Sequence, residues 1–399
     1  MNRRDFLRRG LIGAVTLSVS PGVLRTAIAK PVASGDSPYG PLGEPDENGL
    51  RLPAGFTSRV IATSGAMVGT SGYVWHPAPD GGATFARPDG GWVYVSNSEV
   101  PLMGGAGAVV FDAGANVVGA HRILTGTSLN CGGGPTPWGT WLSGEEHDGG
   151  MIWECDPHGV GEGVPRPALG IFKHEAAIVD PVRHHVYLTE DQGDGRFYRF
   201  TPDTPGDLTA GQLEVATVAT PDGGAVTWTP IDPNGTPFAP TRSQVPSSTA
   251  FDGGEGIYYH DGVVWFTTKG DNRVWALDCA SQTLEIAYDD TMVDAPLRGV
   301  DNVTVASNGD VLVAEDGGDM QICVLATSRR RRAERTVAPI VQIVGHTASE
   351  VTGPAFSPDG TRLYFSSQRG PDLAYDAPDK AMQSSWQGVT YEVTGPFRR

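Results

Sequence analysis

The sequence of 399 residues is poor in positive charge, in cysteine and in long apolar runs. Its 29 lysines and arginines face 46 acidic residues, a formal net charge of −17, which argues against nucleic acid as a partner because phosphate backbones bind basic surfaces. No run approaches the ~20 apolar residues of a membrane-spanning helix. A G-x-S-x-G elbow and a glycine-rich dinucleotide loop leading into a helix are also absent, so neither of these hydrolase and oxidoreductase signatures applies.

Glycine and proline are abundant instead, with 54 and 31 residues. Hydrophobic residues still make up 39%, including nine Trp, eleven Tyr and thirteen Phe, which is too many for a disordered chain. The composition therefore favours a β protein that is rich in turns.

The first 29 residues resemble an export signal. Arg3 and Arg4 precede a short apolar run over 11–19 and an A-x-A site at 27–29. We expect the twin-arginine translocase to export the protein to the periplasm or the cell exterior and residues 1–29 to be removed, leaving 24 basic against 45 acidic side chains, a net charge of −21. Because this pathway carries folded proteins with their cofactors, it favours a bound metal, and it favours free or metal-ligating thiols over disulfides for the four cysteines.

A short β-branched or aromatic segment followed by a polar or acidic cluster occurs six times. Four of the five spacings between the copies are 46–52 residues, close to the length of a propeller blade. We therefore predict an all-β, six-bladed β-propeller in one domain over 30–399, with the Pro/Gly-rich segment 201–246 as an inserted loop or hairpin. A strand at 56–63 would close the ring beside 388–393. Two stacked β domains are the alternative. The copies are anchored on Tyr94, Trp141, Tyr187, Trp265, Leu312 and Tyr364.

Acidic residues follow the central strand in four of these copies. Equivalent positions of a propeller converge on its axis, where several carboxylates would repel one another unless cations lie between them. Oxygen ligands of this kind suit calcium or iron. The other interpretation is that the acids form hairpin turns, although Glu is a poorer turn residue than Asp or Asn. The acids are Glu99, Glu145, Glu146, Glu190, Asp191, Glu315 and Asp316.

The segment 128–146 carries the most specific pattern, with a cysteine, a glycine run, the letters TPWGTW and a pair of glutamates. It resembles the PhoX-type alkaline phosphatases, as do His174-Glu175, Glu255-Gly256 and Asp301-Asn302 before their strands. The likeness runs in order from about residue 91 to 369.

This resemblance implies a propeller with an axial iron and calcium cluster that hydrolyses small phosphate monoesters. Glu255 and Cys131 would be the catalytic residues at the cluster. The metal ligands would come from Cys131, Glu145, Glu146, Glu175, Glu190, Asp191, Glu255, Asp301, Asn302, Glu315 and Asp316.

The sequence departs from the family pattern at Gly253, where phosphatases of the family carry an arginine that clamps the phosphate. Lys269 and Arg369 are the candidates to contact the phosphate in its place. The departure leaves open a calcium-dependent, lactonase-like hydrolase or a non-enzymatic, metal-stabilised binding propeller. We expect a monomer whose partner is a small phosphorylated substrate.

Overall fold

The computed structural model describes residues 32–398, apart from 235–239, 292–293, 328–334 and 373–386. The predicted export signal at 1–29 therefore lies outside the described residues. Within them the chain forms 27 strands, and its helical structure is limited to two 3-10 turns, η1 (Pro167–Leu169) and η2 (Thr241–Ser243). None of the described helical turns is long and apolar enough to cross a bilayer. The predicted all-β class is confirmed.

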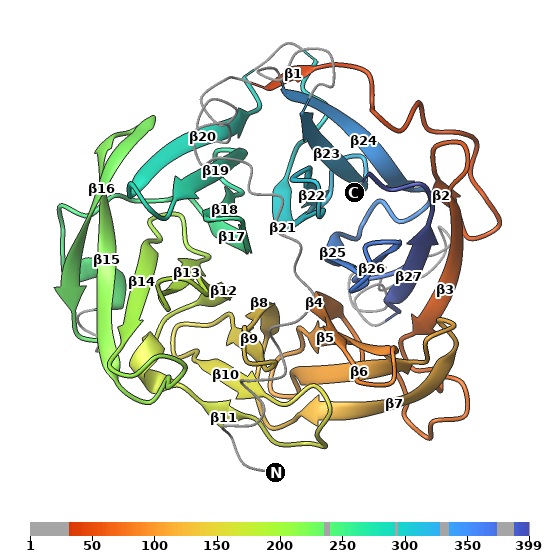
Figure 1. The fold of residues 1–399 in the computed structure, drawn as a ribbon, viewed down its shortest axis with the longest axis horizontal. Coiled ribbons are helices and arrows are strands. Elements are labelled where there is room, and N and C mark those ends of the chain that lie inside the picture. Colours follow the sequence, from red (N-terminus) through yellow and green to blue (C-terminus); the bar gives the residue numbers. More distant parts are fainter. Residues whose placement is uncertain (1–31, 235–239, 292–293, 328–334, 373–386, 399) are drawn as a thin grey trace.

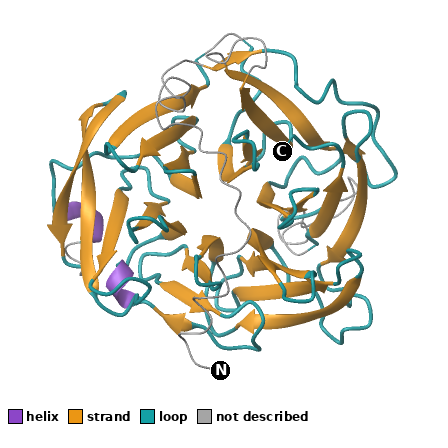
Figure 2. Cartoon of the chain, in the orientation of Figure 1, coloured by secondary structure: helices purple, strands orange, loops and turns teal. Residues whose placement is uncertain are grey.

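The strands form sheets arranged radially around a central axis, as in a propeller (Figures 1 and 2). Two four-stranded sheets come first in the chain. They contain β4 (Pro79–Ala86), β5 (Trp92–Ser98), β6 (Gly105–Phe111) and β7 (Val117–Leu124), and then β8 (Asn130–Pro135), β9 (Trp141–Glu145), β10 (Ile152–Cys155) and β11 (Val164–Pro165).

The last two sheets include strands from both ends of the chain. One contains β21 (Val300–Val305), β22 (Val311–Glu315), β23 (Gln321–Thr327), β24 (Arg335–Ile343), β1 (Val32–Ser34) and β2 (Leu50–Arg51). The other contains β25 (Val351–Phe356), β26 (Arg362–Ser367), β27 (Val389–Thr394) and β3 (Thr57–Thr63). Antiparallel pairing of β3 with β27 confirms the predicted closure of the ring by strands from the two ends of the chain.

The middle of the chain forms one nine-stranded sheet, so hydrogen bonding gives five sheets rather than the predicted six. The cause is β16, which pairs with β15 on one side and, through residues 223–225, with β20 on the other. In order, the sheet contains β12 (His174–Val179), β13 (Val186–Glu190), β14 (Phe197–Pro202), β15 (Gly211–Thr220), β16 (Gly223–Ile231), β20 (Thr283–Asp289), β19 (Arg273–Asp278), β18 (Val263–Thr268) and β17 (Gly254–His260).

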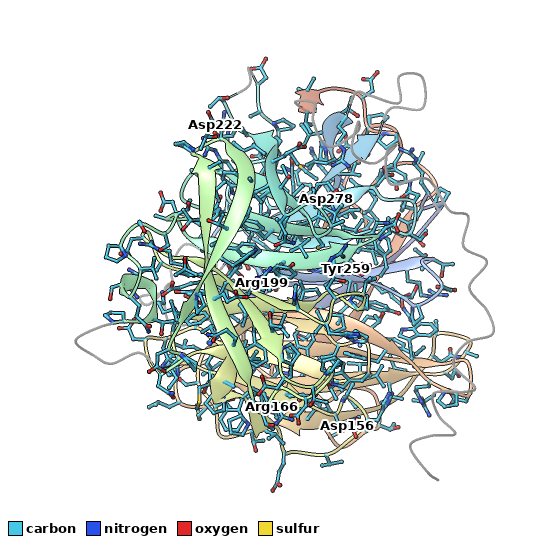
Figure 3. The ribbon with its side chains drawn as sticks, turned by 60° about the vertical axis from the view of Figure 1, so that its left-hand side comes forward. Asp156, Arg166, Arg199, Asp222, Tyr259 and Asp278 are labelled. Carbon is cyan, nitrogen blue, oxygen red and sulfur yellow. The ribbon has the colours of Figure 1, made fainter. Side chains whose placement is uncertain are left out.

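The segment 201–246, expected to be an inserted loop or hairpin, thus contains the whole of the long β15–β16 hairpin of this sheet. Figure 3 shows the hairpin at the outer edge, with Asp222 at its tip and Arg199 on the neighbouring strand. The Arg199 guanidinium lies 4.6 Å from the centre of the Trp228 ring and forms an ion pair with Glu214 at 2.8 Å. These contacts hold the hairpin against β14.

The strands form where the sequence has β-branched and aromatic runs between tight turns. The Trp92–Ser98 and Val263–Thr268 strands are buried along their whole length because neighbouring sheets cover both faces. Asp261 and Gly262 both have positive φ, 46° and 85°, as a two-residue hairpin turn of type I′ requires. Hydrophobic clusters then fill the space between adjacent sheets, and the core is a ring of interfaces rather than a single centre.

Candidate metal centre

The innermost strands β4, β8, β12, β17 and β21 each present a polar residue to the axis at their second position. Immediately after the first paired residue, the register of each strand with its neighbour shifts, so the second residue lies in a β-bulge. A bulge re-aims a side chain that would otherwise follow the alternation of the strand. The residues at this position are Asp80, Cys131, Glu175, Glu255 and Asp301.

These five side chains, together with Glu99 and Glu146, form three groups that lie close enough together to hold a metal ion. Within each group, ligand atoms lie within 4.8 Å of one another, and Cys131 and Glu175 each belong to two groups. The groups therefore form one continuous arrangement, called the axial cluster below. They are Asp80 with Glu99 and Cys131, Cys131 with Glu146 and Glu175, and Glu175 with Glu255 and Asp301.

The glycine run after Cys131 lets β8 approach its neighbours. A Cβ on Gly132 would lie 2.6 Å from Glu175 Oε1, and one on Gly134 would meet the Ala177 carbonyl, so neither position has room for a side chain. The glycines are thus explained by packing around the axial cluster.

Burial and mutual repulsion make the axial cluster costly for a metal-free protein. Both carboxylate oxygens of Glu175 are buried and have no hydrogen-bond partner among the described residues. Burial, and then the charge of Glu255, raises the pKa of Glu175 well above its ordinary value. Burial also raises the pKa of Glu146 to about 8 and that of Asp301 to about 7. Orphaned buried oxygens beside a thiol and further carboxyls are the donor set that cations neutralise, so these residues fit bound metal.

The predicted ligands Glu145, Glu190 and Glu315 each close a hairpin in this structure. Each is the last residue of its strand and accepts a hydrogen bond from the backbone N–H six residues later, at 3.3, 3.0 and 3.0 Å. Their other contacts are also structural: Glu145 accepts from Trp153 Nε1 at 2.8 Å and Glu190 from the Tyr198 hydroxyl at 2.7 Å. None of the three belongs to the three groups of the axial cluster, so their contacts favour the hairpin-turn interpretation, and their role as metal ligands stays a prediction.

The residue that follows β5, β9, β13 or β22 lies at the open end of the central axis, called the mouth below. Glu146 and Glu99 belong to the axial cluster, whereas the predicted ligands Asp191 and Asp316 lie outside its three groups. Asp191 Oδ2 lies 3.9 Å from Lys173 Nζ, and Asp316 Oδ2 lies 3.3 Å from Lys269 Nζ. Two lysines thus partly neutralise this acidic rim.

Asn302, also predicted as a ligand, lies outside the three groups and uses its amide in hydrogen bonds. Its Nδ2 donates to Asp301 Oδ1 at 2.9 Å, and its Oδ1 accepts from the Gly353 N–H at 2.6 Å. The amide oxygen is therefore engaged with the next inner strand, and Asn302 orients Asp301.

The two predicted phosphate-contacting residues lie at the same mouth. Lys269 Nζ lies 2.9 Å from Glu255 Oε1, and Arg369 Nη2 lies 2.7 Å from Glu350 Oε1. Gly253 has a φ of 66°, which a side chain rarely adopts, and its carbonyl accepts a hydrogen bond from the Lys269 N–H at 2.8 Å. A Cβ at position 253 would lie 3.8 Å from Lys269 Cβ, so Lys269 occupies the neighbourhood of the missing arginine.

Sequence reasoning missed Asp80, Glu350 and Lys173. Asp80 is the second residue of β4, the inner strand of the first sheet. An alignment of the repeat copies on the start of their inner strands finds it, whereas an alignment on the acids after the central strand does not. Glu350 precedes its inner strand by one residue and is buried. Lys173 lies two residues before Glu175.

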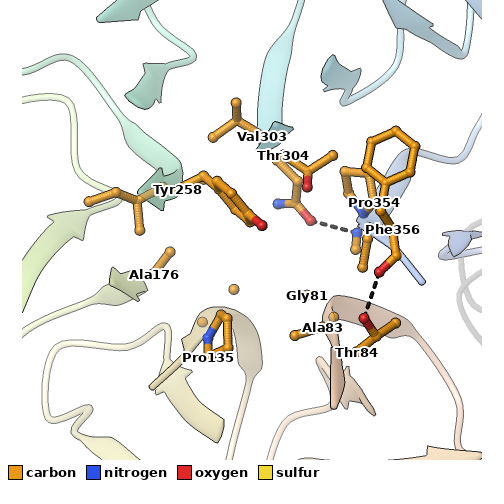
Figure 4. Close-up of a pocket in the computed structure, with 18 residues that line it drawn as sticks. Gly81, Ala83, Thr84, Pro135, Ala176, Tyr258, Val303, Thr304, Pro354 and Phe356 are labelled. Carbon is orange, nitrogen blue, oxygen red and sulfur yellow. Dashed lines mark hydrogen bonds between the residues drawn. The ribbon is translucent and has the colours of Figure 1, made fainter. Parts of the chain in front are cut away.

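A small cavity of about 80 Å³ lies on the axis among the inner strands. Its lining includes the residues that directly follow the cluster residues, among them Gly81, Gly132, Ala176 and Gly256, and it extends to Tyr258 (Figure 4). The second residue of each of these inner strands therefore belongs to the axial cluster, and the third residue, which is mostly small, lines the cavity.

Known proteins resemble this chain in sequence and in fold. A model of the alkaline phosphatase PhoX family matches residues 91–151, 147–282 and 262–370, whereas a search of curated proteins found no match. The fold is similar to Pseudomonas fluorescens PhoX in complex with vanadate, a transition state analogue, with a TM-score of 0.68 and 16% identity over 91% of this chain and 98% of that one.

Two further solved structures are less similar. The gluconolactonase XC5397 from Xanthomonas campestris has a TM-score of 0.46 and 13% identity, covering 90% of this chain and 99% of its own. The calcium-binding protein regucalcin from Agrobacterium tumefaciens has a TM-score of 0.43 and 15% identity, covering 81% and 94%. The family model matches well over half of the sequence, so the chain belongs to the PhoX family of alkaline phosphatases, and both the family and the phosphatase class predicted from the sequence are confirmed.

Proposed function

We propose that this protein is an exported, metal-dependent phosphatase that hydrolyses small phosphate monoesters at the axial cluster. The observation that carries the proposal is the arrangement of seven potential ligands in three overlapping groups. Glu175, at the junction of two groups, is buried and has no hydrogen-bond partner in the described part of the chain. A phosphatase needs concentrated positive charge where the transferred phosphoryl group sits. Metals held by these acids would provide it.

We further propose that the scaffold is a six-bladed propeller in which the nine-stranded sheet comprises two blades. The inner strands β4, β8, β12, β17, β21 and β25 contact one another in a closed ring, which favours six units. The two halves of the nine-stranded sheet also pack face to face, since the Phe197 ring on β14 stacks on the Phe266 ring on β18 with 4.3 Å between centroids. Faces that pack in this way are typical of neighbouring blades.

The ligand types suggest which metals the axial cluster holds. Cys131, Glu146 and Glu175 would hold iron, because a thiolate suits iron and is foreign to calcium. Glu175, Glu255 and Asp301 would hold a second iron, and the carboxylates of Asp80 and Glu99 would hold calcium. When bound, these metals would polarise the phosphoryl oxygens and increase the acidity of a coordinated nucleophile.

The protein's own side chains would attract and orient the substrate. Lys269 and Arg369 form ion pairs with carboxylates at the mouth, and both side chains are about one third exposed. A dianionic phosphate that reaches the cluster would find both cations held in place, so they lose little freedom on binding. Lys173, 3.2 Å from Glu146 Oε1, is a third cation at the same rim. In the roles proposed here, Glu255 and Cys131 contact the reacting centre through the metals they hold.

Metal analysis and turnover of p-nitrophenyl phosphate test this proposal on the full chain. Glu175→Gln should lose bound metal and lower kcat/KM by at least ~10²-fold, because it removes a shared ligand. The matched control is Glu315→Gln, which changes a buried glutamate that only closes a hairpin and should keep both metals and activity. The proposal fails if the wild-type chain carries no iron or calcium and hydrolyses no monoester, or if the two variants behave alike.

Export through the twin-arginine translocase and a monomeric state complete the proposal. Arg3 and Arg4 support the export route. Replacing both with lysine should keep the protein in the cytoplasmic fraction, whereas an unchanged distribution between fractions would exclude this route. Light scattering of the purified protein tests the monomer against a particle of twice the mass.

A further inference from the structure

Four strands that pair directly with an inner strand, β5, β9, β13 and β18, share one feature. In each, the same position faces the backbone of an axial cluster residue on the inner strand of the next sheet unit. It is the residue before the last in β5, β9, β13 and β18. The four residues are Asn97, Gly144, Thr189 and Thr267, and the backbone groups they face belong to Cys131, Glu175, Glu255 and Asp301, in the same order.

Asn97 makes the most extensive of these contacts. It is fully buried, and its Nδ2 donates to the carbonyls of Cys131 at 2.8 Å and Gly132 at 2.7 Å. Its Oδ1 accepts from Trp141 Nε1 at 2.9 Å and from the Ser143 hydroxyl at 2.8 Å. The Trp141 nitrogen can only donate, so the orientation of the amide is fixed, and both amide hydrogens are directed at the bulge that carries Cys131.

Thr189 and Thr267 make the equivalent contacts with one hydroxyl each. Thr189 Oγ1 donates to the Glu255 carbonyl at 2.6 Å, and Thr267 Oγ1 donates to the Asp301 carbonyl. Both threonines are buried, and their hydroxyls form hydrogen bonds with backbone groups of the inner strands.

Gly144, the remaining member of the four, lies equally close to the backbone of a cluster residue. A Cβ there would lie 2.7 Å from the Glu175 carbonyl, so the strand backbone itself occupies the space that a side chain fills elsewhere. Contact at this position is therefore a repeated feature of the ring and not a property of one residue type.

From these contacts we infer that Asn97, Thr189 and Thr267 are positioning residues, which fix the ligand-bearing bulges of Cys131, Glu255 and Asp301 from the preceding sheet unit. The physical reason lies in the bulges. A bulge interrupts the ladder, so its carbonyl needs a donor from outside the strand pair, and that donor then determines where the attached side chain lies. This inference rests on the proposed function, because it concerns the geometry of the metal-binding groups.

Isosteric variants of the full chain test the inference. Thr189→Val and Thr267→Val remove the hydroxyl and keep the shape, and the corresponding serine variants restore the donor. Thr390→Val is the matched control, because Thr390 is equally buried but bonds to the Ser366 hydroxyl and Trp75 Nε1. The readouts are the chelator concentration that removes half of the bound iron and calcium, and the melting temperature of the metal-free protein.

We expect the valine variants to lose metal at ~10 to 100-fold lower chelator activity than the wild type, as second-shell changes typically do. The serine variants and Thr390→Val should stay within about threefold of the wild type. A second arm uses Asn97→Asp, which keeps the size but replaces the donors with an acceptor, and which should weaken iron binding more than calcium binding.

Wild-type metal retention in the valine variants and in Asn97→Asp would overturn the inference, as would an equal loss in Thr390→Val. A valine variant that does not fold leaves the decision to Asn97→Asp. If the wild-type chain itself binds no metal and hydrolyses no monoester, the proposed function fails and this inference with it. If the wild type does both while the variants match it, only this inference fails.

Discussion

Removing the metals should make the protein less stable as the pH rises. In the metal-free state, burial and neighbouring acids raise the pKa of Glu146 from 4.5 to about 8 and that of Asp301 from 3.8 to about 7. The folded state therefore keeps protons that the unfolded chain has already released. Since the proton excess of the folded state favours folding at low pH, the stabilisation is complete below about pH 4 and is lost as the pH rises to about 8.

The magnitude follows from the same values. One proton of difference between the folded and unfolded states changes the free energy of unfolding by about 1.4 kcal/mol for each pH unit. Glu146 alone should therefore reduce this free energy by on the order of 4 kcal/mol between pH 5 and pH 8. For a chain of this size, this corresponds to a fall of roughly 5 °C in melting temperature.

Calorimetry of the chelator-treated full chain at pH 5, 6.5 and 8, at one ionic strength, measures this effect. A metal-loaded sample should show the opposite trend, because metal binding requires deprotonated ligands. Glu146→Gln removes the titrating group and should reduce the slope of the metal-free protein. A metal-free melting temperature that is constant or rises between pH 5 and pH 8 would refute the reasoning, as would an unchanged slope in Glu146→Gln.

Three substitutions separate the roles of the site residues. Cys131→Ala should lower bound iron at least tenfold while calcium at the other carboxylates persists, and equal retention of iron, measured by metal analysis, would contradict the assignment of this thiol. Glu315→Gln should lower the free energy of unfolding by about 1–3 kcal/mol, measured by denaturant titration, because two buried backbone donors lose a charged acceptor, yet leave the metal content unchanged. Lys269→Met should raise KM for p-nitrophenyl phosphate about tenfold or more with metal content unchanged, and an unaltered KM would assign this lysine to charge balance alone.

The spacing of strand segments was enough to predict the all-β class and the radial arrangement. The repeat length reflects a local unit of short strands and tight turns, and such units are encoded by nearby residues. Pairing of β3 with β27 was also predictable, because a propeller ring can close when strands from the two ends of the chain share one sheet. The count of sheets was not, since it depends on three residues of β16 that happen to pair with β20.

The structure places some of the predicted ligands in the axial cluster and others outside it, and the difference has one physical cause. In sequence, Glu145-Glu146, Glu190-Asp191 and Glu315-Asp316 are three similar pairs of acids. Successive residues leave a strand in different directions, so the first acid of each pair turns back to close its hairpin and the second faces the axis. Only the structure distinguishes them.

The sequence by itself determined the types of chemistry available: a thiol, many carboxylates, few cations, and strand units that repeat. Tertiary structure decided which of these meet. Asp80 and Asp301 are 221 positions apart, yet both belong to the axial cluster, because a propeller brings the start of every inner strand to one axis and a bulge at each start turns the second side chain inward. Convergence of this kind depends on the closure of the ring, which no local pattern contains.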